Sequence, residues 1–252
     1  MNDIFNLNNK IALITGGGSG IGFGIAEQTI LAGAKVVITG RSEDKLLISK
    51  NQLGPNCFMY VNDVTEKQKH RALIVDIENN IGPISILINN AGMHCKKNSI
   101  ETTDEEFQSV MDTNINSVFA LTREVLKFMI PRKKGSIINV SSMSALYGLP
   151  QVVAYSSSKS ALTGLTRTLA SEYSHLGIRF NSVVPGFIES QMFRDIMRKD
   201  PEREKRILSR TPAGRFGTPA DIGKAVTFLA SDAADFITGV CLPVDGGNSI
   251  GF

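Results

Sequence analysis

Seven short apolar runs are spread along the chain, and they constrain the fold more than any other feature of the sequence. Most are continuous rather than alternating, which is typical of strands buried on both faces of a parallel sheet. Helical patterns with apolar positions three and four residues apart separate them. This alternation predicts an α/β fold, a doubly wound and mostly parallel seven-stranded sheet with helices on both faces. The runs are 10–15, 35–40, 57–61, 84–90, 136–142, 178–184 and 240–244, and the helical patterns are 21–32, 65–81, 104–130, 152–176 and 219–230.

Length leaves the number of domains open, because 252 residues lie close to the size at which chains divide. The glycine-rich loop near residue 20 and the tyrosine–lysine pair near residue 157 must meet at one ligand for the chemistry derived below. We therefore expect one domain over 1–252. The charged segment at about 186–218 is expected to be an insertion over the edge of the sheet that covers the substrate, although its charges also suit a solvated helix face.

Composition and charge exclude several classes of protein. With 42% hydrophobic residues the chain can bury a large core, and a net charge of +3 is too small for a nucleic-acid binder. Cys57, Cys95 and Cys241 are odd in number and widely spaced, which predicts neither disulfides nor a metal site. The first ten residues lack a leader pattern, and no apolar run is long enough to span a membrane. We expect a cytoplasmic protein that needs no metal.

A glycine-rich turn follows the first predicted strand and precedes a helix. Backbone amides in such a turn approach a pyrophosphate closely, and the helix N-terminus favours the anion. The spacing, G-x-x-x-G-x-G, departs from the commonest dinucleotide fingerprint, and no G-K-S/T follows it, which disfavours a nucleoside triphosphatase. The turn therefore predicts a dinucleotide site made by Gly16, Gly17, Gly18, Ser19, Gly20, Ile21 and Gly22.

The end of the second predicted strand reads Thr39-Gly40-Arg41-Ser42. An acid at this position would accept from the free 2′-hydroxyl of an adenosine ribose, whereas a basic residue would bind a 2′-phosphate. Arg41 therefore favours NADP(H) over NAD(H), with an exposed side chain at the start of a helix as the alternative interpretation.

Tyr155 and Lys159 are four residues apart in a helical pattern, so they lie on one face within reach of each other. An ammonium beside a phenol is expected to lower the pKa of the phenol, which makes it a better general base. Ser142 follows the fifth predicted strand, where the carboxyl end of a strand meets the ligand crevice. Its hydroxyl could hydrogen-bond a substrate oxygen.

Taken together, the motifs make the sequence resemble the short-chain dehydrogenase/reductase family over essentially its full length. They are TGGGSGIG (15–22), NDV (62–64), NNAG (89–92), Asn114, Ser142, YSSSK (155–159), PG (185–186) and LPVDGG (242–247). A Y-x-x-x-K alone is common, but all these motifs in this order are not. The resemblance implies a Rossmann-like fold and an NAD(P)-dependent oxidoreductase acting on CH–OH groups.

The resemblance also implies residue roles. Tyr155 would transfer the proton, Ser142 would steady the reacting carbonyl, and Lys159 would lower the pKa of Tyr155 and hold the nicotinamide ribose. Asn114 would complete a catalytic tetrad by holding a water beside Lys159. Besides the glycine-rich turn, the implied cofactor contacts are Asp63 and Val64 at the adenine, Asn89, Ala91 and Gly92 on the adenosine side, and Pro185, Gly186 and Ile188 at the nicotinamide end.

The resemblance implies that the substrate is a small carbonyl compound or alcohol. The residues predicted to contact it are Ser142, His94, Lys96 and Gln151, with Glu189 near them. Within the family the chain is most similar to enzymes of the gluconate 5-dehydrogenase type, which suggests a sugar acid or small polyol. Similarity to 3-oxoacyl-(acyl-carrier-protein) reductases is nearly as good. A dinucleotide-binding sensor or scaffold without catalysis is the alternative from another class. The resemblance further implies a homotetramer.

Overall fold

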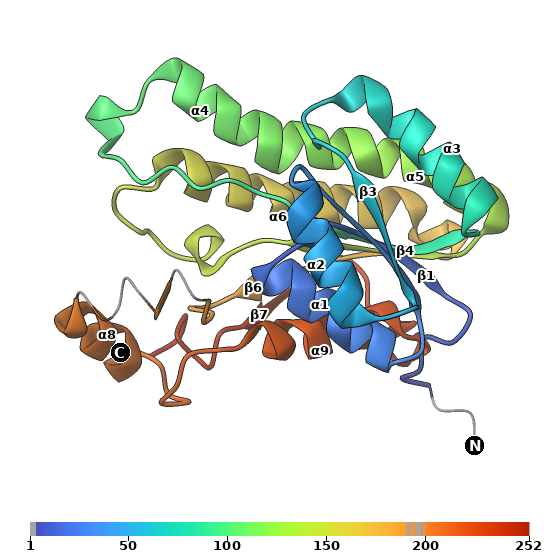
Figure 1. Ribbon diagram of the computed structural model, residues 1–252. Coiled ribbons are helices and arrows are strands. Elements are labelled where there is room, and N and C mark those ends of the chain that lie inside the picture. Colours follow the sequence, from blue (N-terminus) through green and yellow to red (C-terminus); the bar gives the residue numbers. More distant parts are fainter. Residues whose placement is uncertain (1–3, 191–192, 195–197, 199, 252) are drawn as a thin grey trace.

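A single seven-stranded parallel sheet forms the centre of the molecule, in the order β3-β2-β1-β4-β5-β6-β7. The computed structural model describes residues 4–190, 193, 194, 198 and 200–251. The chain runs outward from β1 to β3, returns to pair β4 with β1, and continues outward to β7 (Figure 1). This confirms the predicted doubly wound Rossmann-like sheet and places its topological switch between β1 and β4.

The strands begin and end within two residues of the apolar runs in the sequence. They are β1 (Ile11–Thr15), β2 (Lys35–Gly40), β3 (Cys57–Val61), β4 (Ile84–Asn89), β5 (Gly135–Val140), β6 (Ile178–Pro185) and β7 (Cys241–Val244). The helices are α1 (Gly20–Leu31), α2 (Glu43–Leu53), α3 (His70–Asn80), α4 (Asp104–Met111), α5 (Ser117–Arg132), α6 (Val153–Tyr173), α8 (Pro201–Ser209) and α9 (Pro219–Ala230).

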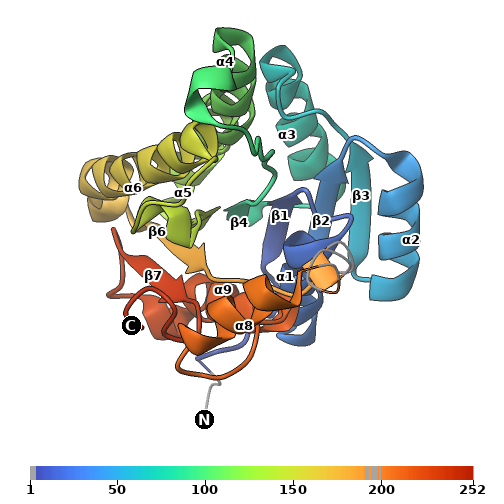
Figure 2. The ribbon, with the colours of Figure 1, turned by 90° about the vertical axis from the view of Figure 1, so that its left-hand side faces the viewer.

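Two hydrophobic cores form because both faces of the sheet are apolar. One face packs against α1, α2 and α9, through residues such as Ile25, Leu46 and Val226. The other packs against α3, α5 and α6, through residues such as Ile74 and Leu121. The two layers of helices are visible on either side of the sheet in Figure 2.

The segment predicted as one helix over 104–130 is interrupted at its centre. α4 and α5 are joined by a wide, π-helical turn over Asp112–Asn116, and within it Asn114 is fully buried. Turns of this kind add one residue to the helix and are frequent at functional sites. No glycine or proline marks the interruption in the sequence, so helical periodicity alone does not predict it.

Helix α8 belongs to the segment predicted as an insertion at 186–218. Asp200 accepts a hydrogen bond from the Arg203 backbone and begins the helix, with Pro201 in its first turn. Residues 191, 192, 195–197 and 199 of the insertion lie outside the described residues. Among the helices described, none is long and apolar enough to cross a membrane.

Candidate active site

A cleft of about 600 Å³ opens at the carboxyl ends of β1, β2 and β4, at the topological switch of the sheet. Ligands of doubly wound sheets bind at this position. The predicted cofactor residues that line it are Gly16, Gly18, Ser19, Gly20, Ile21, Gly22, Arg41, Asp63, Val64, Ala91, Gly92 and Ile188. The structure therefore brings together most of the predicted cofactor set, drawn from five separate stretches of sequence.

Close packing explains the glycines of the loop. A Cβ atom on Gly22 would stand 2.2 Å from the Gly16 carbonyl oxygen, and Gly16 itself has a φ of 68°, which favours glycine. Gly17 lies against Ile38 rather than in the wall of the cleft, so its role in the described structure is packing. Ser19, at the N-cap of α1, makes no capping hydrogen bond within the described chain. The first amides of α1 are thus left for a ligand.

The far end of the cleft is polar and cationic. Arg41 lines it together with Ser42 and Lys45, two residues that the sequence analysis did not single out. The pKa of Asp63 is lowered, chiefly by its hydrogen bond from the Thr65 backbone and in smaller part by the Arg41 charge. In the same wall the amide nitrogen of Asn62 is buried without a hydrogen-bond partner among the described residues. A buried donor without a partner is expected to meet an acceptor on a ligand.

Of the two asparagines in the NNAG motif, Asn90 lines the cleft, whereas the predicted cofactor residue was Asn89. Asn89 is buried, and its amide donates to Thr122 Oγ1 at 3.1 Å and to Asn139 Oδ1 at 2.9 Å, inside the protein. Asn90 lines the cleft instead, and its amide donates to the Thr15 and Gly16 carbonyls. The period-2 alternation of strand β4 could have distinguished the two asparagines.

Lys159 lies at the buried centre of the site. It is 5% exposed, and its Nζ donates to the Val140 carbonyl at 2.8 Å. Burial disfavours the charged form and lowers the pKa of Lys159 to about 8. Its Nζ lies 5.7 Å from the centroid of the Tyr155 ring, so the predicted pair is formed.

Asn114 is fixed beside Lys159 by three hydrogen bonds. Its Oδ1 accepts from the Met93 backbone at 2.8 Å, and its Nδ2 donates to the Met93 carbonyl at 3.0 Å and to Ser158 Oγ at 2.9 Å. A Cβ atom on Gly92 would stand 3.2 Å from Asn114 Oδ1 and 3.5 Å from Lys159 Nζ. Both polar groups therefore border the same small space next to Gly92.

Tyr155 and Ser142 face each other across the site, since the side chain of Ser142 hydrogen-bonds the phenol. We expected Lys159 to lower the pKa of Tyr155, but the pKa is raised. Burial is the main cause, and the hydrogen bond from Ser142 opposes it only in part. Without a ligand the phenol is therefore held in its protonated form at neutral pH.

The predicted residues at the nicotinamide end follow strand β6. Pro185 ends the strand, and Gly186 hydrogen-bonds the Val244 carbonyl at 3.1 Å. A Cβ atom on Gly186 would stand 2.7 Å from the Asp245 Cα, so glycine is needed for this close approach to the end of β7. Ile188 then reaches the cleft, next to Glu189.

The predicted substrate residues lie in different surroundings. The His94 ring packs against the Tyr155 ring with centroids 4.6 Å apart. The pKa of His94 is lowered by its desolvation first and then by the positive charges of Lys96 and Arg203. The side chain of Gln151 instead donates to Asn98 at 3.3 Å.

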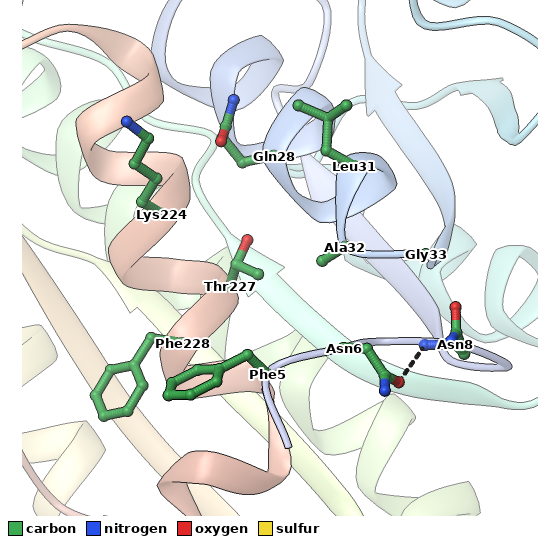
Figure 3. A pocket seen from close by; sticks show the side chains of 10 residues that line it. All are labelled: Phe5, Asn6, Asn8, Gln28, Leu31, Ala32, Gly33, Lys224, Thr227 and Phe228. Atoms are coloured by element: carbon green, nitrogen blue, oxygen red, sulfur yellow. Dashed lines mark hydrogen bonds between the residues drawn. The ribbon is translucent and has the colours of Figure 1, made fainter. Parts of the chain in front are cut away.

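A second cavity, of about 560 Å³, lies away from this cleft, between the N-terminal segment, the end of α1 and helix α9 (Figure 3). Residues 5–8, 28–33 and 224–228 of these three elements supply its lining. The Phe5 and Phe228 rings, with centroids 6.4 Å apart, and Leu31 form its apolar wall, and Lys224 is the charged residue that lines it. None of the predicted site residues borders this cavity.

Comparisons with known proteins agree with this geometry. A family model described as "Enoyl-(Acyl carrier protein) reductase" matches residues 16–249. A 3-oxoacyl-(acyl-carrier-protein) reductase of Vibrio cholerae is 37% identical over 96% of this chain and 98% of its own length. A 2-dehydro-3-deoxy-D-gluconate 5-dehydrogenase of Dickeya dadantii is 37% identical over 96% of both chains. The crystal structure of a gluconate 5-dehydrogenase from Burkholderia cenocepacia, in complex with NADP and tartrate, superimposes with a TM-score of 0.93 at 34% identity, covering 99% of both chains.

The site and the fold define an oxidoreductase that uses a nicotinamide cofactor and acts on CH–OH groups. The chain belongs to the short-chain dehydrogenase/reductase family.

Proposed function

We propose that this protein uses NADP(H) to interconvert a secondary alcohol and a ketone on a sugar acid or a small polyol. The observation that carries the proposal is the meeting of Tyr155, Ser142 and Lys159 beside the cleft at the topological switch of the sheet. The His94 ring packs on the phenol, and the charges of Lys96 and Arg203 act on His94.

The cleft fits a dinucleotide. The uncapped N-terminus of α1 and the close-packed Gly16 and Gly22 offer backbone amides to a pyrophosphate. The unpaired amide of Asn62 offers a donor to the adenine. Lys159 would hold the nicotinamide ribose, and when bound the nicotinamide would exchange a hydride with the substrate carbon.

A preference for NADP(H) follows from the cationic end of the cleft. Arg41 and Lys45 supply two positive charges, and the Ser42 hydroxyl supplies a donor, whereas a free 2′-hydroxyl would need an acceptor there. Asp63 is the acid of this wall, and its carboxylate is already bonded to both the backbone and the hydroxyl of Thr65. NADP in the related Burkholderia structure supports the same preference.

The chemistry of the site is proton transfer at Tyr155. Its protonated phenol is positioned to give a proton to a carbonyl oxygen during reduction, while Ser142 donates a hydrogen bond to that same oxygen. In the reverse direction the phenolate would take the proton of the alcohol. The Lys159 ammonium would stabilise that phenolate when the cofactor is bound, and Asn114 would hold a water beside Lys159 to relay the proton.

A carboxylate on the substrate would find positive charge near the reacting carbon. Lys96 and Arg203 bring two charges toward His94, which itself covers the phenol. Lys97 is not part of this group, because its ammonium is bonded to Glu106 at 3.0 Å. These charges favour a sugar acid over an uncharged polyol.

Reduction of 3-oxoacyl groups on an acidic carrier protein is the second candidate, and the Vibrio cholerae relative supports it. A carrier would need a basic surface beside the cleft. The best basic cluster in the sequence, at 132–134, directly precedes β5 and so lies at the opposite edge of the sheet, where Arg132 is paired with Glu78. This placement favours the small substrate.

Turnover of sugar acids, polyols and 3-oxoacyl thioesters, followed by the absorbance of NADPH and NADH, tests the proposal. We expect a sugar acid to give the highest kcat/KM, and Tyr155→Phe to abolish its turnover while NADPH binding, measured by fluorescence titration, is kept. Turnover in Tyr155→Phe like that of the wild type would refute the assigned chemistry. A thioester as the best substrate would refute the assigned substrate class, and no turnover of any compound would favour a dinucleotide-binding sensor.

The insertion and the assembly are part of the same proposal. We place the insertion at 186–218 over the substrate, as a cover on the one domain that spans 1–252, and the chain in a homotetramer. The side chain of Phe119, on α5, is 44% exposed and lies under the Arg123 guanidinium, which suits a helix face that meets another subunit. Light scattering of the purified protein tests the assembly.

A further inference from the structure

Tyr147 joins three segments that are far apart in the sequence. It follows Ser142 by five residues, and its hydroxyl donates to Asn248 Oδ1 in the C-terminal loop at 2.6 Å. The Arg210 guanidinium, just beyond α8, lies 4.5 Å from the centroid of its ring. We call Tyr147, Asn248, Arg210 and Thr211 the Tyr147 latch.

Asn248 is the centre of the latch and bonds its other three members. Asn248 is 1% exposed, and its Nδ2 donates to Thr211 Oγ1 at 2.8 Å, while its carbonyl accepts from Arg210 Nε at 3.2 Å. Thr211 Oγ1 donates in turn to the Ile207 carbonyl inside α8. Asn248 and Thr211 are buried and Tyr147 is half-buried, so this network is expected to fix the relative positions of the segments that it joins.

The segments joined by the latch both reach the reacting groups. The turn that contains Tyr147 begins at Ser142, whose Oγ accepts from the Ser144 backbone at 3.2 Å, and the Tyr147 hydroxyl also contacts the sulfur of Met143. On the other side, α8 carries Arg203, whose charge acts on His94 above Tyr155. The position of α8 relative to Ser142 therefore depends on Tyr147.

We propose that Tyr147 is a positioning residue that holds α8 over the active site and thereby sets the affinity for the substrate. The inference rests on the proposed function, in which Ser142 bonds the substrate oxygen and Arg203 adds positive charge near the reacting carbon. Tyr147 itself performs no chemistry, so its loss is expected to raise KM for the substrate while kcat and the affinity for NADPH stay nearly constant.

Trypsin digestion tests the holding role without any substrate. In Tyr147→Phe the ring stays over Arg210 but the bond to Asn248 is lost, so cleavage after Arg203, Lys205 and Arg206 should become about fivefold faster, the effect of one net hydrogen bond on local opening. Tyr60→Phe is the matched control. Tyr60 lies on the distant edge strand β3, and the substitution removes the bond from its hydroxyl to Asp76 on α3. Unchanged cleavage in Tyr147→Phe, or equal acceleration in Tyr60→Phe, would overturn the proposal.

Kinetics with the best substrate of the panel test the positioning role. We expect KM to rise about fivefold in Tyr147→Phe. In a protein that already carries Asn248→Ala, Tyr147→Phe should add little, because the bond between the two side chains is then already lost. An unchanged KM, or fully additive effects, would overturn the role in substrate binding. The digestion needs no substrate, so its result does not depend on whether a sugar acid is turned over. Failure of the holding role of Tyr147 is therefore distinguished from failure of the proposed function.

Discussion

Substitution of Asn114 by alanine should affect both stability and catalysis, and the structure gives the size of the first effect. The side chain is fully buried and makes three hydrogen bonds, two to the Met93 backbone and one to Ser158. At about 1 kcal/mol net for each bond, the substitution should lower the free energy of unfolding by about 3 kcal/mol. In a domain of this size that corresponds to a fall in Tm of roughly 6–12 °C.

Asn114→Asp separates the two effects. A carboxylate keeps an acceptor for the Met93 amide, but it cannot donate to the Met93 carbonyl or to Ser158. It also puts a negative charge beside the Lys159 ammonium, which should raise the pKa of Lys159 above about 8. We therefore expect a fall in Tm at least as large as in Asn114→Ala, because a buried carboxylate would face the Met93 carbonyl. We also expect the pH profile of kcat to shift to higher pH, which the alanine variant should not show.

Differential scanning fluorimetry gives Tm for both variants, and kcat measured from pH 6 to 10 gives the pH profile. NADPH binding should persist in both, because the cofactor cleft is lined by other residues. A Tm of Asn114→Ala within about 2 °C of the wild type would refute the stabilising role of the three bonds. A pH profile of Asn114→Asp identical to that of the wild type would refute the conclusion that residue 114 lies close enough to Lys159 to shift its pKa.

Three further predictions concern the cofactor site and acid stability. Arg41→Ala should lower kcat/KM for NADPH by about 10- to 100-fold, because a charge-assisted bond is lost, and kcat/KM for NADH by less than about twofold. Equal losses with the two cofactors would argue against a contact between Arg41 and the 2′-phosphate. Gly22→Ala should weaken NADPH binding at least about tenfold in calorimetric titration, because its Cβ would stand 2.2 Å from the Gly16 carbonyl oxygen, and unchanged affinity would contradict this. Burial lowers the pKa of His70 in the folded state, so the unfolded state binds more protons below pH 6.5 and the free energy of unfolding should fall as the pH drops from 6.5. His70→Gln should reduce that slope in urea titrations, and an equal slope would rule His70 out as the cause.

The sheet could be predicted from the sequence because buried parallel strands are continuous apolar runs bounded by turns. All seven strands occur where such runs occur. The glycine loop could be predicted for the same kind of reason, since Gly16 and Gly22 satisfy local geometric demands that other residues cannot meet.

Features that depend on the folded environment could not be predicted. The pKa of Tyr155 is raised rather than lowered, because burial of the phenol outweighs its polar contacts, and burial is a property of the whole fold. The Tyr147 latch joins residues 101 positions apart, Tyr147 and Asn248, and neither belongs to a recognisable motif. The interruption between α4 and α5 has no local signal either, because it is stabilised by the buried contacts of Asn114.

The wide turn over Asp112–Asn116 has a consequence for how this site can change by mutation. Each residue of an α-helix advances the chain by about 100° around the axis, so deleting one residue from the turn would join α4 and α5 into a regular helix and rotate one relative to the other by about that angle. The buried Val110 of α4 would then turn away from its present neighbours, and Asn114 would leave Lys159. Substitutions can tune this part of the molecule, but its length is fixed, so insertions and deletions within 112–116 should be absent from active homologues.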